Sequence, residues 1–255
     1  MDLGAKCSNV LIKTLEPINY VNKFRKRNVL IVGNGMLAHE FSDYRDDNDI
    51  IIFASGVSNS DEISENEFER EEELLTKTID NISSEKIIYF STCAMYDKYL
   101  VDNRYTKHKL HMESYIKKNV KNFIIARLPQ VIGKSNNKQQ LMGFLYDKIL
   151  NNEEFELFNI DRNIIDIRDV KKILEYSLTN HLFNRETINI ANPKNINMIT
   201  LMGYIENIFE KKATYSIKNL EGSFYIDIEK ISPIIKKLNL FGPTYMRDII
   251  KVNYG

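Results

Sequence analysis

The chain has 255 residues, 43% of them hydrophobic, and equal numbers of basic and acidic side chains, 35 of each. This composition supports a sizeable core, and the balanced charge argues against nucleic acid or anionic lipid as a partner. The only cysteines, Cys7 and Cys93, argue against a disulfide framework or a structural metal site. Because no apolar run could span a bilayer and no signal peptide is apparent, we expect a cytoplasmic protein with a small polar ligand.

Residues 1–27 precede the first strong structural signal and form an expected N-terminal extension. They end in a basic cluster at 23–27, which we interpret as a solvated surface. A short apolar run at 8–15 could cover an open sheet edge, and we state this as a hypothesis.

A glycine turn follows the first predicted strand. Residues 29–32 are all aliphatic, as in a strand that is buried on both faces, and Gly33 and Gly35 come directly after them. Such glycines allow backbone N–H groups to approach a pyrophosphate, and Ala38 allows the next helix to pack close to the strand. An ordinary strand-turn-helix is the alternative, but two of only 10 glycines fall here, which favours phosphate binding.

The next elements alternate between strand and helix patterns. A second apolar strand at 49–53 ends in small residues, a Glu-rich amphipathic helix is expected within 61–84, and further strands are expected at 86–90 and 122–127. This order predicts a parallel α/β sheet. Ligands of such sheets bind at the carboxyl ends of the strands, where the 86–90 strand delivers Ser91 and Thr92.

Tyr105 and Lys109 are the only Tyr-x-x-x-Lys pair in the chain, at the start of a helical pattern. Their spacing places both side chains on one helix face, so the ammonium can stabilise a phenolate, and such a phenol can act as an acid or base. The alternatives are a surface tyrosine and, for Thr92, a residue that only caps its strand. Cys93 reads as a small buried apolar residue, and the four histidines show no metal spacing, so we expect no metal site.

Several motifs together resemble the extended short-chain dehydrogenase/reductase group, the NAD-dependent epimerase/dehydratase family that modifies nucleotide sugars. The resemblance covers about residues 28–250. It rests on the glycine turn, the 53–56 strand end, the 91–96 segment with Tyr105 and Lys109, the 127–133 segment, the 162–170 segment and the last strand at 187–191.

The resemblance implies a fold, a cofactor and a set of site residues. The fold is a Rossmann-like parallel α/β sheet with a small C-terminal α/β substrate lobe, and the cofactor is NAD or NADP. The implied catalytic residues are Thr92, Tyr105 and Lys109. The implied cofactor-binding residues are Gly33, Gly35, Met36, Leu37, Ala54, Ser55, Gly56, Lys109 and Leu128, and the implied substrate-binding residues are Thr92, Cys93, Gln130 and Arg162. Asp169 is implied to be structural.

The chain also departs from the family pattern. Between the first two strands there is no room for the usual second and third strands of the family's sheet, so the acidic residue that holds the adenosine ribose has no counterpart. The interval from Thr92 to Tyr105 is about half its usual length. Cys93 and Ala94 replace the acid pair of the dehydratases, and no histidine supports epimerisation through an enolate.

We interpret these features as those of a nucleotide-sugar oxidoreductase. We expect NAD(P)-dependent reduction or oxidation at C4 of a sugar nucleotide in surface polysaccharide biosynthesis. A 4-epimerase is one alternative, and a degenerate binding or scaffold subunit is another. The dinucleotide-binding domain is predicted to comprise 28–133 and about 160–191, and the substrate lobe 134–159 and 192–255. The resemblance also implies a homodimer.

Overall fold

A computed structural model describes residues 30–42, 50–82, 85–134, 140–220, 222 and 224–255. The N-terminal extension, including the segment proposed to cover the sheet edge, lies outside these residues. The elements of the first half of the described chain are β1 (Leu30–Val32), α1 (Met36–Glu40), β2 (Ile50–Phe53), α2 (Glu65–Asp80), β3 (Lys86–Thr92), the 3₁₀ turn η3 (Ala94–Tyr96), α3 (Arg104–Asn119), β4 (Phe123–Leu128) and β5 (Gln130–Ile132).

The second half alternates short strands with helices. Its elements are α4 (Leu141–Leu150), β6 (Phe155–Asn159), β7 (Asp161–Arg162), β8 (Ile164–Asp166), α5 (Ile167–Thr179), β9 (Glu186–Asn189), β10 (Ile196–Asn197), α6 (Met198–Phe209), β11 (Tyr215–Asn219), η4 (Glu229–Ile231), α7 (Ser232–Leu238) and α8 (Tyr245–Tyr254). Among the described residues, no helix is both long and apolar enough to cross a membrane.

The main sheet confirms the predicted parallel α/β fold. Its order is β1-β2-β3-β4-β9, and every neighbouring pair of strands is parallel. The strand β1 pairs directly with β2 and is the terminal strand of this sheet within the described part of the chain. Among the described residues no strand pairs with the outer edge of β1. The described sheet therefore lacks the usual second and third strands, as the sequence predicted.

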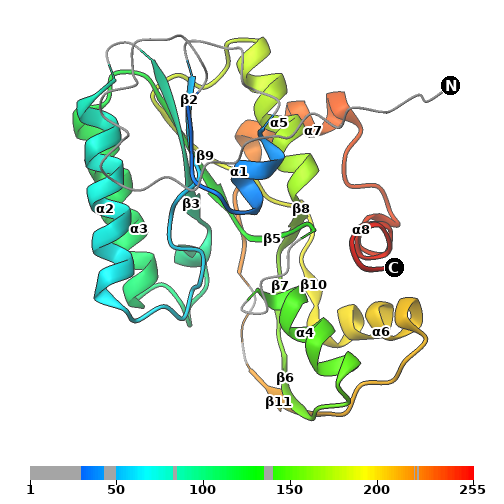
Figure 1. The fold of residues 1–255 in the computed structure, drawn as a ribbon. Coiled ribbons are helices and arrows are strands. Elements are labelled where there is room, and N and C mark those ends of the chain that lie inside the picture. The colour runs from blue at the N-terminus through cyan, green and yellow to red at the C-terminus, as the bar shows by residue number, and fades with distance from the viewer. Residues whose placement is uncertain (1–29, 43–49, 83–84, 135–139, 221, 223) are drawn as a thin grey trace, which may run out of the picture.

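Helices cover both faces of the sheet (Figure 1). The helices α2 and α3 lie on one face, where they pack around Leu75, Tyr89 and Met112. On the other face α1, α5 and α7 lie against a second set of buried residues that includes Ile52 and Ile124. Because each central strand is buried on both sides, its residues are almost all apolar, which explains the continuous aliphatic runs in the sequence.

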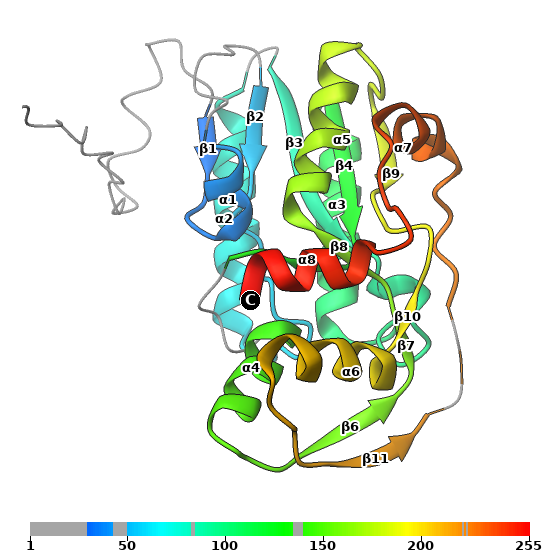
Figure 2. The ribbon, with the colours of Figure 1, turned by 90° about the vertical axis from the view of Figure 1, so that its right-hand side faces the viewer.

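A second core lies beyond the carboxyl ends of the strands, where α4, α6, β6 and β11 gather (Figures 1 and 2). Figure 2 shows α8 passing between α5 and α6. The strands β6 and β11 pair in parallel, and β5 pairs with β8. Residues of η4 and α7 pack against the first core and not the second. The division into two domains with the predicted boundaries stays a prediction.

Candidate active site

The glycine turn joins β1 to α1 and contains two glycines with different constraints. Gly33 has a φ of +132°, and a Cβ at this position would lie 2.5 Å from the carbonyl oxygen of Ala54. Gly33 is thus required for the packing of the turn against the end of β2. Gly35 has an ordinary extended conformation, with φ −89°, and a Cβ there would have no neighbour within 4 Å. The space above Gly35 is therefore open to a ligand.

A cavity of about 600 Å³ opens beside this turn. Its volume is in the range of small-molecule and cofactor sites. The lining combines polar, apolar, basic and acidic residues, and consists of Asn34, Gly35, Met36, His39, Glu40, Lys134, Ile167, Arg168 and Asn253. The guanidinium of Arg168 is bound to Asp166, the N-cap of α5, through Nε at 2.7 Å. Thr92, Tyr105 and Lys109 do not line this cavity.

The strand β3 brings Thr92 to its carboxyl end, and α3 begins beside it. Asn103 caps α3, because its Oδ1 accepts a hydrogen bond from the backbone N–H of Thr106 at 2.8 Å. This places Tyr105 in the first turn of the helix. The hydroxyl of Thr92 accepts the backbone N–H of Ala94 at 3.0 Å. The fold therefore brings Thr92, Tyr105 and Lys109 together.

Tyr105 is almost completely buried, with 9% of its surface exposed. Burial raises the pKa of its phenol, and the charge of Glu71 raises it further. The Lys109 ammonium and hydrogen bonding with Thr92 lower the pKa, as the sequence predicted for Lys109, but the net pKa is above its ordinary value of 10. In this state Tyr105 is a neutral phenol, which can donate a proton.

Lys109 is only 3% exposed and donates to three protein acceptors. Its Nζ lies 2.9 Å from Oε1 of Glu71, 3.3 Å from the hydroxyl of Tyr89 and 3.5 Å from the carbonyl oxygen of Phe90. It also lies 6.0 Å from the centre of the Tyr105 ring. All three ammonium hydrogens thus have an acceptor within the protein.

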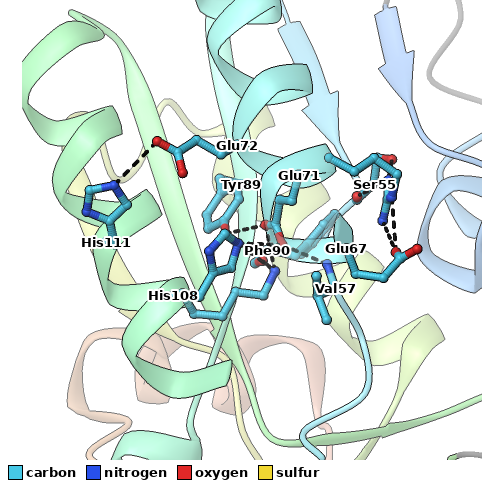
Figure 3. A network of polar contacts seen from close by, with 11 residues as sticks. Ser55, Val57, Glu67, Glu71, Glu72, Tyr89, Phe90, His108 and His111 are labelled. Atoms are coloured by element: carbon cyan, nitrogen blue, oxygen red, sulfur yellow. Dashed lines mark hydrogen bonds and ion pairs between the residues drawn. The ribbon is translucent and has the colours of Figure 1, made fainter. Parts of the chain in front are cut away.

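Glu71 of α2 is a residue that our sequence reasoning missed, and it is completely buried (Figure 3). Besides Lys109, it accepts hydrogen bonds from the hydroxyl of Tyr89 at 2.6 Å and the backbone N–H of Val57 at 2.7 Å, and Nε2 of His108 lies 3.2 Å away. Burial alone would raise the pKa of Glu71, but Lys109, His108 and Tyr89 hold it far below its ordinary value.

Of the small residues after β2, Gly56 lies against this cluster. A Cβ on Gly56 would overlap the Lys109 ammonium and lie 2.9 Å from Oε1 of Glu71, so glycine provides the space for the ion pair. Ser55 accepts hydrogen bonds from Arg70, also of α2, and Ala54 packs against the first core. The loop that was expected to line a cofactor is therefore fixed to α2.

The other predicted site residues have protein partners or lie in the core. The guanidinium of Arg162 forms an ion pair with the buried carboxylate of Asp97. Cys93 is buried against Ala191 and Ile226, and burial raises the pKa of its thiol. The backbone N–H of Gln130 donates to the carbonyl oxygen of Asn163 at 3.2 Å.

The remaining predicted residues line the glycine turn or the sheet. Met36 belongs to the cavity lining, Leu37 packs against the first core, and Leu128 is buried at the end of β4. Asp169 lies in the first turn of α5 and pairs with Lys172 at 2.9 Å, in agreement with a structural role. The assignment of individual residues to cofactor and substrate stays a prediction.

Comparison with solved structures identifies the fold. UDP-glucuronic acid 4-epimerase from Bacillus cereus, solved with UDP-glucuronic acid and NAD, superposes with a TM-score of 0.65 at 19% identity, covering 87% of this chain and 77% of that one. RMD from Pseudomonas aeruginosa, solved with NADPH, gives 0.70 at 13% identity, covering 89% and 97%. UDP-N-acetylglucosamine 4-epimerase from B. cereus gives 0.65 at 17%, covering 90% and 100%.

This chain has the Rossmann-type fold of nucleotide-sugar epimerases. The predicted fold is thereby confirmed across most of the chain. No protein-family model matches the sequence, and no curated protein matches it. The likeness is thus one of structure at low sequence identity.

Proposed function

We propose that this chain is an NAD(P)-dependent nucleotide-sugar oxidoreductase that acts at C4 of the sugar. The observation that carries the proposal is the convergence of Thr92, Tyr105 and Lys109 at the carboxyl end of β3, in a fold shared with nucleotide-sugar epimerases. Structures with this fold were solved with NAD or NADPH, which supports the cofactor class.

The residues of the glycine turn fit a dinucleotide. Gly35 leaves open space where a backbone can approach a diphosphate, and the adjoining cavity is lined by basic and acidic side chains, with Lys134 and Arg168 as its cationic groups and Asp166 paired with Arg168. Gly33, Gly35 and Met36 would hold the diphosphate, and the 54–56 loop would lie beside the rest of the cofactor. No acidic ribose partner is found at the end of a second strand in the described part of the chain, since β2 (Ile50–Phe53) is followed by Ala54 and Ser55.

The dinucleotide would supply or accept a hydride at the sugar carbon. The chain's own part is proton transfer at the sugar oxygen. Tyr105, a neutral phenol in this structure, would donate its proton to that oxygen during reduction, and Thr92 would hydrogen-bond the same oxygen. Lys109 would stabilise the tyrosinate that is left. Burial of Tyr105 excludes water from the proton-transfer step.

The test is NAD(P)H oxidation with UDP- and dTDP-linked 4-keto sugars as substrates. Tyr105→Phe should lower turnover by about 100-fold or more, because it removes only the proton donor. Tyr99→Phe is the matched control, since Tyr99 is an exposed tyrosine, and it should retain full activity. Equal turnover of Tyr105→Phe and the wild type would contradict the proposed role. Conversion of a UDP-sugar that carries a C4 hydroxyl into its C4 epimer, without net oxidation or reduction of the dinucleotide, would instead favour the 4-epimerase.

A non-catalytic binding subunit is the second candidate. The observation that favours it is that all three hydrogens of the Lys109 ammonium already have protein acceptors. In that case the protein would bind a nucleotide sugar but would turn over no keto sugar or sugar alcohol with either dinucleotide. Isothermal titration with UDP-sugars beside the turnover assay separates these two functions.

A further inference from the structure

The polar cluster around Glu71 (Figure 3) includes the ion pair with Lys109, which belongs to the candidate active site. On α2 the buried positions are Phe68, Glu71, Leu75, Thr78 and Ile79, so the carboxylate occupies a core position of an amphipathic helix. A charge at such a position is costly unless it is paired and hydrogen-bonded. An apolar residue of similar size would also fill this position. Packing alone therefore does not explain why the chain has a carboxylate there.

Glu71 joins three parts of the site. One carboxylate oxygen, Oε1, accepts from Lys109 of α3 and from Tyr89 of β3. The other oxygen, Oε2, accepts from the backbone of Val57 in the loop after β2 and lies 3.2 Å from His108. The same side chain thus fixes the lysine, the neighbouring strand and the loop expected to lie against the cofactor.

The bonds of Lys109 are unequal in length. Those to Glu71 and Tyr89 are 2.9 Å and 3.3 Å, whereas that to the carbonyl oxygen of Phe90 is 3.5 Å, at the limit of hydrogen bonding. A ligand hydroxyl could therefore replace the Phe90 carbonyl while the other two acceptors keep the ammonium in place. The hydrogen bond from Lys109 to the Phe90 carbonyl is therefore the one that a ligand could replace.

We infer that Glu71 is a positioning residue of the active site, which fixes the Lys109 ammonium and couples it to the loop after β2. This inference rests on the proposed function for its catalytic meaning. Glu71 acts on Tyr105 through charge and through Lys109. Lys109, Glu71, Cys93 and Tyr89 are ionisable groups that act on Tyr105, and Glu71 carries the negative charge that disfavours the tyrosinate.

The inference predicts the titration of Tyr105 in the free protein. Replacing Glu71 with Gln keeps the shape of the side chain and removes its charge, so Tyr105 should ionise at a lower pH than in the wild type. Tyrosine ionisation is followed by NMR with ring-labelled tyrosine, and Tyr105→Phe identifies the signal. This readout needs neither cofactor nor substrate, so it holds even if the proposed reaction fails.

Glu113→Gln is the matched control. Glu113 is also a buried carboxylate that faces β3, but it pairs with Arg127 and accepts from Ser91. Glu113→Gln should leave the pH at which Tyr105 ionises unchanged, although this substitution too breaks a buried ion pair. In the turnover assay, Glu71→Gln should lower kcat by about tenfold and move its pH profile to lower pH, and Glu113→Gln should not move the profile.

Two outcomes would overturn the inference. One is an unchanged Tyr105 titration in Glu71→Gln, and the other is an equal shift in Glu113→Gln. Should Glu71→Gln fail to fold, the wild type decides the question through ¹⁵N NMR of the lysine ammonium groups. We expect one ammonium signal protected from exchange and coupled to a glutamate carboxyl carbon, and absence of that signal would contradict the positioning role.

Discussion

The ion pair between Glu71 and Lys109 gives the sharpest stability prediction. Glu71→Leu would leave the Lys109 ammonium almost completely buried, with only the Tyr89 hydroxyl and the Phe90 carbonyl as acceptors. Removing one partner of a buried pair costs about 3–5 kcal/mol. This is a large fraction of the roughly 5–15 kcal/mol that stabilises a typical domain.

The double variant Glu71→Leu with Lys109→Met should be much less destabilised than the sum of the single variants. It removes both buried charges together, and apolar replacement of a buried pair is often nearly neutral. We expect a coupling free energy of about 2–3 kcal/mol from urea unfolding of the four proteins. Tyr89 and His108 lose their acceptor in both proteins that carry the Glu71 change, so their contribution cancels from the cycle.

The exposed pair Glu73 and Lys77, also on α2, is the control. Its charged atoms are 3.0 Å apart, which is close to the separation in the buried pair, but both side chains are more than half exposed. Its coupling should be about 0.3–0.5 kcal/mol. A Glu71–Lys109 coupling no larger than this value would refute the reasoning that burial makes the pair strong.

Three further predictions concern the free energy of unfolding, two for glycine variants and one for its dependence on pH. Gly33→Ala should lower the free energy of unfolding by about 3 kcal/mol or more in urea unfolding, because the residue has a positive φ and its new Cβ would meet the backbone of Ala54. Gly203→Ala, within α6 and with open space around it, should instead raise the free energy of unfolding by about 0.5–1 kcal/mol in the same assay. Folding lowers the pKa of Glu71 and Glu113 below their ordinary value of 4.5, so stability should change little between pH 7 and about pH 5 and fall as the pH drops further. Urea midpoints measured from pH 7 to pH 3 check this. In Glu71→Gln the urea midpoint should fall less at low pH than in the wild type.

The sequence predicted the elements of the sheet because buried parallel strands leave a strong pattern. Ile50–Phe53 and Lys86–Thr92 are nearly continuous apolar runs, and both form central strands of the sheet. The short interval between Gly35 and Ile50 also predicted that the usual second and third strands are missing, and in the described part of the chain β1 pairs directly with β2. Chain length between two strands limits what can be inserted, so the missing strands could be derived from spacing, whereas the strand order rested on the family resemblance.

The partners of charged side chains could not be derived in the same way. Arg162 and Asp97 are 65 positions apart, and the fold alone brings them into contact. Glu71 did carry a signal, since it falls on the apolar face of α2 between Phe68 and Leu75. A charged residue at a core position predicts a buried partner, although the sequence does not say that the partner is Lys109.

The same limit applies to the proton chemistry of Tyr105. Its spacing to Lys109 predicted an ammonium that lowers the phenol pKa, and the structure contains this effect. The opposing effects are burial, which depends on how the chain packs around the first turn of α3, and the charge of Glu71 on another helix. Sequence spacing within one helix contains neither of these contributions.

Dinucleotide binding to the wild type and to Gly35→Val tests the central claim most directly. Binding is followed by the change in fluorescence of added NADH or NADPH. A Cβ at position 35 would meet no protein atom within 4 Å, and the extended backbone suits valine, so Gly35→Val should change the urea midpoint only slightly. We predict that the wild type binds at least one dinucleotide and that Gly35→Val binds it at least tenfold more weakly. No binding of either dinucleotide at millimolar concentration, or equal binding by both proteins, would contradict the account.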